Sequence, residues 1–374
     1  MMARRWIPGP GRLVLWLLVL AALAIGVVRF AFGLGAVTNL SDRFPWGLWI
    51  AFDVLGGVAL AAGGFTMAAV VYVGHRERYR PLLRPAIVTG FLGYLLVVIN
   101  LMLDLGRPYR IWHPLVMWNP HSVMFEVAWC VMLYTLVLAL EFGQIVLERL
   151  GRWTMLRMTH LALPPLVVAG VILSTLHQSS LGTLFLIVPG KLHPLWYTSL
   201  LPLLFFVSAL AVGPAMVIVE SYFSARALRR ELEVPLLVDL ARVAFVILAV
   251  YLGLKVTDLI ARGAWVYMAT PSVESVLFGL EILVGVVAPM ILLSLNGGRI
   301  VRSVFVSSAL VVLGVVINRF NVAVTGMLAG SHVTYIPSWM EIVVTVASIA
   351  AGVLAYLWIA ERLPVFPKGK PATA

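Results

Sequence analysis

Ten long apolar segments dominate this sequence and restrict the folds that it can adopt. Each has about 20 residues and few charges, the length that an α-helix needs to cross a bilayer. A backbone in lipid must satisfy its own hydrogen bonds, so such runs predict membrane-spanning helices. The segments lie near residues 13–33, 46–73, 85–103, 121–143, 161–188, 198–223, 237–260, 274–293, 300–320 and 339–360.

The composition supports a polytopic membrane protein, because 62% of the 374 residues are hydrophobic and only 11% are charged. The first apolar segment is too long for a signal-peptide core, and we expect it to remain as a helix. A single cysteine, Cys130, excludes an internal disulfide and a protein-held iron–sulfur cluster, which needs about four thiolates. No spacing typical of a metal site is present.

The basic residues predict the orientation of the chain. With ten spans, 18 of the 27 Lys and Arg residues fall on one side of the membrane and six on the other. The basic side is normally cytoplasmic, so both termini are expected in the cytoplasm. The net charge of +11 then reflects orientation, and nucleic acid is not expected as a partner.

A weak internal repeat predicts the helix grouping. One stretch can be laid over another so that Gly64 matches Gly213 and Met67 matches Met216. Four helices separate the copies, which gives both the same orientation, a parallel repeat. The chain is therefore expected to form a single polytopic domain, in which two four-helix bundles (34–188 and 189–320) are flanked by peripheral helices (1–33 and 339–360).

Polar side chains recur at one depth of the predicted spans, in the outer third. Ionisable residues inside a membrane are costly unless they are paired, so they are candidates for function. Lys255 and Asp258 are three residues apart on one helix face and are expected to pair. We expect the whole set to converge in one chamber: Asp53, Asn100, Glu126, His177, Lys255, Asp258, Glu281 and Asn318.

Structural roles remain open for each of these residues. Asp53 can simply form a hydrogen bond with a neighbouring helix, and His177 can be a core histidine.

A second group of ionisable residues lies near the cytoplasmic helix ends, where long side chains reach polar surroundings. That group is Glu141, Glu220 and Asp239.

The histidines give little support for haem. A b-type haem needs two axial ligands on facing helices. Only His121 and His177 are expected at a shared depth.

Several motifs resemble the NrfD family of polysulfide-reductase membrane subunits, and its HybB-type branch in particular. The resemblance spans roughly residues 35–345. The motifs are Phe44-Pro-Trp-Gly-Leu-Trp-Ile-Ala51, Ala59-Leu-Ala-Ala-Gly-Gly64, Asp104-Leu-Gly-Arg-Pro108, Trp118-Asn-Pro120-His-Ser122, His177-Gln-Ser-Ser-Leu-Gly182, Gly190-Lys-Leu-His-Pro-Leu-Trp196 and Asn318-Arg-Phe-Asn-Val322.

The resemblance implies a subunit without haem or metal in the bacterial inner membrane. It implies electron exchange between an extracytoplasmic ferredoxin-like iron–sulfur subunit, on the periplasmic side, and menaquinone or ubiquinone. Large and small subunits of a [NiFe]-hydrogenase are the further partners that it implies. The chain would then act within a hydrogen:quinone oxidoreductase and would not be catalytic alone.

A quinone site needs an apolar slot, donors for the carbonyl oxygens and groups that relay protons. Trp46 and Trp49 are expected to wall the slot, and Asp53 or His177 to bond a carbonyl. Asn100 is a further candidate for quinone binding.

Glu126 is the expected proton relay, because desolvation lets a buried carboxyl alternate between its protonated and ionised forms. Arg107 and His121 lie near it in the sequence and are expected to assist at the site. Glu281, Lys255, Asp258, Glu141, Glu220 and Asp239 are candidates for a proton route that would allow proton translocation.

Two other functions remain open from the sequence. An ion-coupled secondary transporter would also have ten helices, a repeat and buried charges, although its site usually lies near the midplane. A membrane anchor without its own quinone site is the second alternative.

Overall fold

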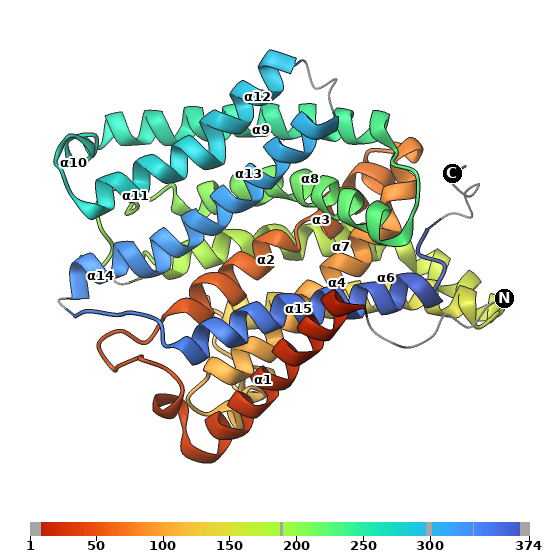
Figure 1. Cartoon of the computed structure of the whole chain (residues 1–374), viewed down its shortest axis with the longest axis horizontal. Helices are drawn as coiled ribbons and strands as arrows, with labels where there is room; N and C mark the ends of the chain where they lie inside the picture. Colours follow the sequence, from red (N-terminus) through yellow and green to blue (C-terminus); the bar gives the residue numbers. More distant parts are fainter. Residues whose placement is uncertain (1–8, 188–189, 297–300, 332, 367–374) are drawn as a thin grey trace.

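The computed structural model describes residues 9–187, 190–296, 301–331 and 333–366 (Figure 1). Ten helical spans in these residues are long and apolar enough to cross a membrane, which confirms the prediction of a multi-pass α-helical membrane protein. The spans are α1 (Pro10–Phe32), a second span (Trp49–Val73) containing α2 (Gly57–Leu60) and α3 (Gly63–Ala68), α4 (Arg80–Asp104), α6 (Val123–Arg149), α7 (Trp153–Leu184), α8 (Leu201–Leu228), α9 (Val234–Ala261), α11 (Val273–Ile282) with α12 (Ala288–Asn296), α13 (Val301–Phe320) with α14 (Gly326–Ser331), and α15 (Trp339–Arg362). Two short helices, α5 (His113–Val116) and α10 (Val266–Ala269), lie in loops.

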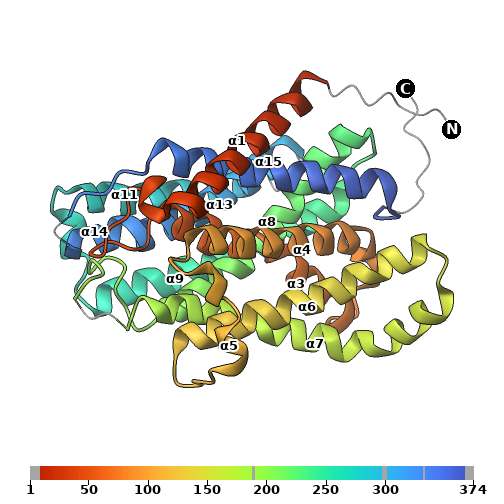
Figure 2. The same ribbon diagram turned by 90° about the horizontal axis from the view of Figure 1, so that it is seen from below.

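The first and last spans pack side by side along one edge of the molecule (Figures 1 and 2). An ion pair between Arg12 and Glu361 joins the start of α1 to the end of α15. We call this end of the molecule the inner end. The opposite end, where Phe32, Asp104 and Trp339 lie, is called the outer end, following the orientation expected from the sequence.

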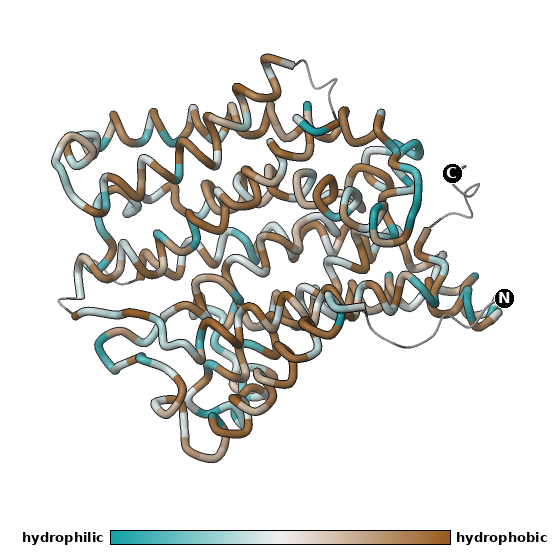
Figure 3. Tube along the Cα trace, in the orientation of Figure 1, coloured by the Kyte–Doolittle hydropathy of each residue, from teal (hydrophilic) through white to brown (hydrophobic). Residues whose placement is uncertain are grey.

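The second span and α8 form the centre of the molecule. In their most apolar windows 78% and 67% of residues are buried, compared with 11% in α1. The second span packs against α4, α7 and α8, and α8 packs against α9 and α13. Helices α6 and α7 run side by side at the periphery (Figure 2). Hydrophilic residues concentrate in loops and at helix ends, and apolar residues dominate the spans (Figure 3).

The second span is not a regular α-helix. Its residues Trp49–Gly56 and Ala69–Val73 are π-helical, and a turn at Ala61 and Ala62 separates α2 from α3. π-helical turns are frequently found at functional sites. Asp53 lies inside the first π-helical segment.

A capping box fixes the start of α15. The Ser338 hydroxyl accepts from the Glu341 backbone N–H, and the Glu341 carboxylate accepts from the Ser338 N–H. Tyr335 donates its hydroxyl to Glu341 (2.5 Å), and burial raises the pKa of this phenol, so it remains a donor. Gly47 passes so close to Tyr335 that a Cβ there would lie 2.2 Å from the hydroxyl oxygen. These contacts set which face of α15 turns toward the second span.

Candidate functional site

A groove of about 600 Å³ lies between the second span, α4, α8 and α15. We call it the Asp53 groove. Its middle is apolar and is formed by residues such as Leu60, Leu96 and Val353. Phe223 and Ile349 also line it and are 58% and 50% exposed, so the groove opens sideways toward the lipid. The shape and lining suit a long apolar molecule that enters from the bilayer.

Polar groups stand at the outer part of this groove. Asp53 is 5% exposed, and its carboxylate accepts a hydrogen bond from the Thr345 hydroxyl (2.9 Å). The Asn100 side-chain oxygen accepts from the Ser348 hydroxyl (2.9 Å), and Asn100 is 3% exposed. The Asn100 side-chain NH2 forms no hydrogen bond with another described residue, so it can donate to a ligand in the groove.

The inner part of the groove carries a second polar pair. The Tyr356 hydroxyl donates to the Glu220 carboxylate, and both residues line the groove. Tyr356 lies 11 residues beyond Thr345 on α15, which corresponds to about 16 Å along the helix. The groove is therefore apolar in its middle and carries a carboxyl group near each end.

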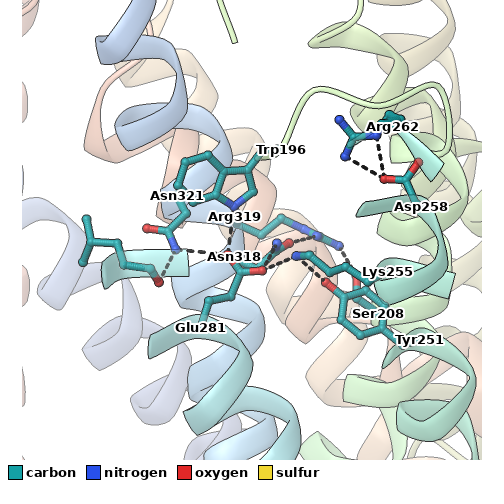
Figure 4. Close-up of polar contacts among 11 residues, drawn as sticks. Trp196, Ser208, Tyr251, Lys255, Asp258, Arg262, Glu281, Asn318, Arg319 and Asn321 are labelled. Carbon is teal, nitrogen blue, oxygen red and sulfur yellow. Dashed lines mark hydrogen bonds and ion pairs between the residues drawn. The ribbon is translucent and has the colours of Figure 1, made fainter. Parts of the chain in front are cut away.

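A separate buried network surrounds Glu281 on α11, and we call it the Glu281 network (Figure 4). The Lys255 ammonium donates to one Glu281 oxygen, and the ion pair is almost fully buried. The Trp196 indole N–H donates to the other oxygen at 3.0 Å. Asn318 and Asn321 also donate to this carboxylate, at 2.9 and 3.0 Å. Four donors satisfy a charge that would otherwise be costly to bury.

A second cation, Arg319, lies next to this network and is fully buried. It donates to the Phe205 carbonyl (3.0 Å) and the Ser208 hydroxyl (2.9 Å) on α8, and to Asn318 (2.7 Å). Its guanidinium also stacks over the Phe205 ring at 3.7 Å. Two buried cations, Lys255 and Arg319, therefore lie in a region with one nearby carboxylate, that of Glu281.

The predicted pairing of Lys255 with Asp258 is wrong. Lys255 turns toward Glu281, whereas Asp258 bonds the Arg262 guanidinium (2.7 Å) and the Thr198 hydroxyl (2.6 Å). Figure 4 shows the Asp258–Arg262 pair apart from the Glu281 network. The (i, i+4) spacing to Arg262 competes with the (i, i+3) spacing to Lys255, and the loop carbonyls of Pro194 and Tyr197 hold Arg262 in place.

The prediction of one shared chamber is also wrong. Asp53 and Asn100 line the Asp53 groove, while Lys255, Glu281 and Asn318 belong to the Glu281 network. Equal depth along different helices does not bring side chains together, because each helix can turn its polar residue toward a different neighbour.

His177 lies in a third place, inside the first half of the molecule. It is fully buried, and its Nδ1 is 3.2 Å from the Tyr94 hydroxyl. The Tyr94 ring packs edge-on against Tyr134. Neither His177 nor Tyr94 lines the Asp53 groove.

Glu126 is half-buried in the first turn of α6. Ser122 caps that helix, and its side chain accepts from the Phe125 N–H. The helix dipole stabilises a carboxylate at this position, which explains how Glu126 is tolerated there. His121 and Arg107 are exposed in the preceding loop.

The remaining candidates are dispersed. Trp46 packs edge-on against Phe185, and the Trp49 indole donates to the Glu341 carbonyl (3.2 Å); neither lines the Asp53 groove. Glu141 is buried on α6. Asp239 forms an ion pair with Arg78 (2.9 Å) at the inner end.

Sequence reasoning missed the residues that complete both polar sites. Thr345 and Ser348 bond Asp53 and Asn100, and the capping signature from Ser338 to Glu341 together with their spacing could have placed them on one face of α15. Arg319 and Asn321 follow Asn318 in the motif Asn318-Arg-Phe-Asn-Val322, and sequence reasoning did not predict their role in burying charge.

Comparison with known proteins shows which family this architecture belongs to. Residues 36–330 match the family model described as polysulphide reductase, NrfD. The chain belongs to the NrfD family. It is 34% identical over 356 residues to the probable Ni/Fe-hydrogenase 2 b-type cytochrome subunit of Escherichia coli, covering 94% of this chain and 91% of that protein.

Two further relatives are integral membrane subunits of other redox complexes. The menaquinone reductase integral membrane subunit of Nitratidesulfovibrio vulgaris is 30% identical, with 90% of this chain and 86% of that protein covered. The Hdr-like menaquinol oxidoreductase integral membrane subunit of Archaeoglobus fulgidus is 23% identical, with 87% of this chain and 88% of that protein covered. The chain is thus an NrfD-family membrane subunit of the kind found in hydrogenase and reductase complexes.

The name of the Escherichia coli relative raises the question of haem, and the two histidines expected at a shared depth do not suit it. His177 faces Tyr94, and His121 is exposed in a loop, so the two do not form a pair of axial ligands. Among the described residues no group of three or more His, Cys, Asp or Glu side chains is placed to hold a metal ion.

Proposed function

We propose that this chain is the quinone-reactive membrane subunit of an oxidoreductase complex and that the Asp53 groove receives the quinone. The observation that carries the proposal is the groove itself, open to lipid, apolar along its middle and polar near its outer end. Quinone reduction takes up two electrons and two protons, so the site must bind a ring and supply protons. A relative named for menaquinone reduction supports this reading.

The groove residues have distinct tasks in this proposal. The Asn100 side-chain NH2 donates a hydrogen bond to one carbonyl oxygen of the substrate, and Ser348 fixes the orientation of the amide. Asp53 holds a proton and delivers it, and Thr345 positions its carboxyl group. The apolar middle of the groove excludes water from the ring and holds the tail.

The finer parts of the proposal concern orientation and partners. Both termini face the cytoplasm, two four-helix bundles (34–188 and 189–320) are flanked by peripheral helices (1–33 and 339–360), and the outer end faces the periplasm of a bacterial inner membrane. An iron–sulfur subunit, with the catalytic chains of a [NiFe]-hydrogenase or a related enzyme, docks at the outer end. Exposed Trp112 and Trp118 in the outer loop before α6 offer apolar contact area for such docking.

A proton route is a further part of the proposal. Glu220 and Tyr356 line the same groove as Asp53, about 16 Å nearer the inner end. Protons passing from Glu220 to Asp53 would cross about half of the hydrocarbon core, which is about 30 Å thick. In proteoliposomes with an internal pH dye, proton movement beyond that of quinone chemistry supports this route, and its absence contradicts it.

Blocking the groove tests the assignment. Ile349→Trp fills its lipid-facing side and is expected to lower quinone retained by the purified protein at least about tenfold, because the ring and tail lose their space. Ile342→Trp is the matched control, since Ile342 is 49% exposed on the same helix and does not line the groove. Quinone extraction and chromatography measure both; equal quinone content in the two variants contradicts the assignment.

The quinone content of the unmodified protein separates the alternatives. A transporter or a simple membrane anchor would retain no quinone. The polar groups Asp53 and Asn100 are also displaced toward the outer end of the groove, whereas a transporter site usually lies near the midplane.

A further inference from the structure

A second large cavity lies on another face of the centre, between the second span, α7, α8 and α9. Its volume is about 530 Å³. We call it the Arg76 cavity, because Arg76, Arg78 and Tyr79 form its inner mouth. Val243 on α9 lines it and is 45% exposed, so the cavity opens toward lipid. It shares no lining residue with the Asp53 groove.

The cavity extends through about one leaflet. Phe65 lines its deep part, and about 12 Å of helix separate Phe65 from Val73, where the second span ends. Arg76 follows directly after that end. A hydrocarbon core is about 30 Å thick, so the cavity reaches from the inner headgroup level toward the middle of the bilayer.

The deep part of the cavity offers no free polar group for a ligand. Its two hydroxyl side chains bond their own helices: Thr66 donates to the Ala62 carbonyl (2.9 Å) and Thr175 to the Val171 carbonyl (2.7 Å). The other deep residues, such as Phe206 and Leu210, are apolar. A ligand must therefore place a hydrocarbon chain there and its polar head at the mouth.

The mouth carries an excess of positive charge. Asp239 is shared by Arg78 (2.9 Å) and Arg242 (3.4 Å), so one carboxylate serves two guanidinium groups. Glu77 pairs with Arg80 (3.3 Å). Arg76 is exposed and has no side-chain hydrogen bond or ion pair with any other described residue. The mouth therefore holds four arginines and two carboxylates. The two uncompensated positive charges are available to an anionic headgroup.

We propose that the Arg76 cavity binds one anionic phospholipid of the bilayer, with an acyl chain between the second span, α7, α8 and α9 and its phosphate at Arg76 and Arg78. Basic pockets between spanning helices are recognised sites for anionic headgroups. The Tyr79 hydroxyl already accepts from Arg78 (2.6 Å) and holds its guanidinium at the mouth. The lipid would fill the crevice between the second span and α9 and fix their separation. This inference does not depend on the quinone proposal.

Lipid retention tests the inference. The delipidated full-length protein in detergent is titrated with phosphatidylglycerol or with phosphatidylcholine of the same acyl chains, and bound lipid is counted by native mass spectrometry. One phosphatidylglycerol is expected to bind in preference to phosphatidylcholine. Arg76→Ala with Arg78→Ala is expected to weaken phosphatidylglycerol binding about 30-fold, from the loss of two basic residues near the headgroup.

Two further variants complete the design. Arg152→Ala with Arg157→Ala removes two exposed arginines from another inner-end position and is expected to leave binding unchanged. Val243→Trp fills the cavity and is expected to abolish binding without changing the charge at the mouth. Equal binding of both lipids, unchanged phosphatidylglycerol binding after loss of Arg76 and Arg78, or unchanged phosphatidylglycerol binding by Val243→Trp would each overturn the inference.

Discussion

Asp53→Asn is expected to slow quinone reduction by the assembled complex about 10²- to 10⁴-fold, the usual contribution of a positioned acid or base. The amide has the shape of the carboxyl group but cannot deliver the proton. Its oxygen would still accept from Thr345, so the quinone should remain bound and the loss should fall on kcat. Turnover with the electron donor and a soluble quinone measures the effect.

The matched control for this variant is Asp42→Asn, which changes an exposed carboxylate in an outer loop and is expected to leave turnover unchanged. Reduction of the iron–sulfur partner before the quinone step should be the same in both proteins. Unaltered kcat in Asp53→Asn would remove this carboxyl group from the mechanism and would leave Glu126 or His177 as the candidate proton donor.

Glu281→Gln is expected to destabilise the protein by about 3–5 kcal/mol, because it leaves buried cations without the carboxylate that Lys255 contacts. Arg319 lies in the same region and adds to the uncompensated positive charge. The midpoint of unfolding of the purified protein in detergent measures the loss. Glu274→Gln, in the first turn of the same helix α11, is the control and should change the midpoint little.

A double variant distinguishes a lost ion pair from poor packing. Lys255→Met with Glu281→Gln removes both charges and keeps an amide oxygen that can accept from Trp196 or the asparagines, and removing both charges of a buried pair costs much less than removing one. The double variant should be more stable than Glu281→Gln alone. If the double variant is as unstable as Glu281→Gln or less stable, the loss of the ion pair is not the cause of the destabilisation.

The spans could be predicted from the sequence because one requirement, that a helix cross the apolar core of the bilayer, sets both their length and their hydropathy. The last predicted span, 339–360, agrees with α15 at Trp339–Arg362. The fifth predicted span starts at residue 161, in agreement with the membrane-competent stretch Leu161–Leu184, although the helix α7 itself begins earlier, at Trp153. Its first turns contain Arg157 and are exposed, so hydropathy alone does not include them.

The contacts between side chains could not be predicted from the sequence in this way. Depth follows from residue number, but the direction that a side chain takes around its helix depends on the packing partner. Lys255 and Asp258 lie three residues apart and still face different neighbours. The π-helical turns around Asp53 change this direction again, and they leave no clear signal in the sequence.

The hydroxyl residues of α15 were missed for a related reason. Threonine and serine in an apolar helix often bond the carbonyl four residues earlier, so their presence indicates little. The single hydroxyl hydrogen of Ser348 is shared between the Val344 carbonyl (3.0 Å) and the Asn100 side-chain oxygen (2.9 Å). Only the packing of α15 against α4 and the second span shows that these hydroxyls complete a site.

Photolabelling with an azidoquinone tests the central claim most directly. After illumination of the purified protein, peptide mass spectrometry should find the label on groove residues of α4 and α15, between Gly93 and Asn100 and between Ser348 and Tyr356, and excess unlabelled quinone should suppress it. Specific label around Glu126, in the Arg76 cavity or nowhere in the chain would contradict a quinone site in the Asp53 groove.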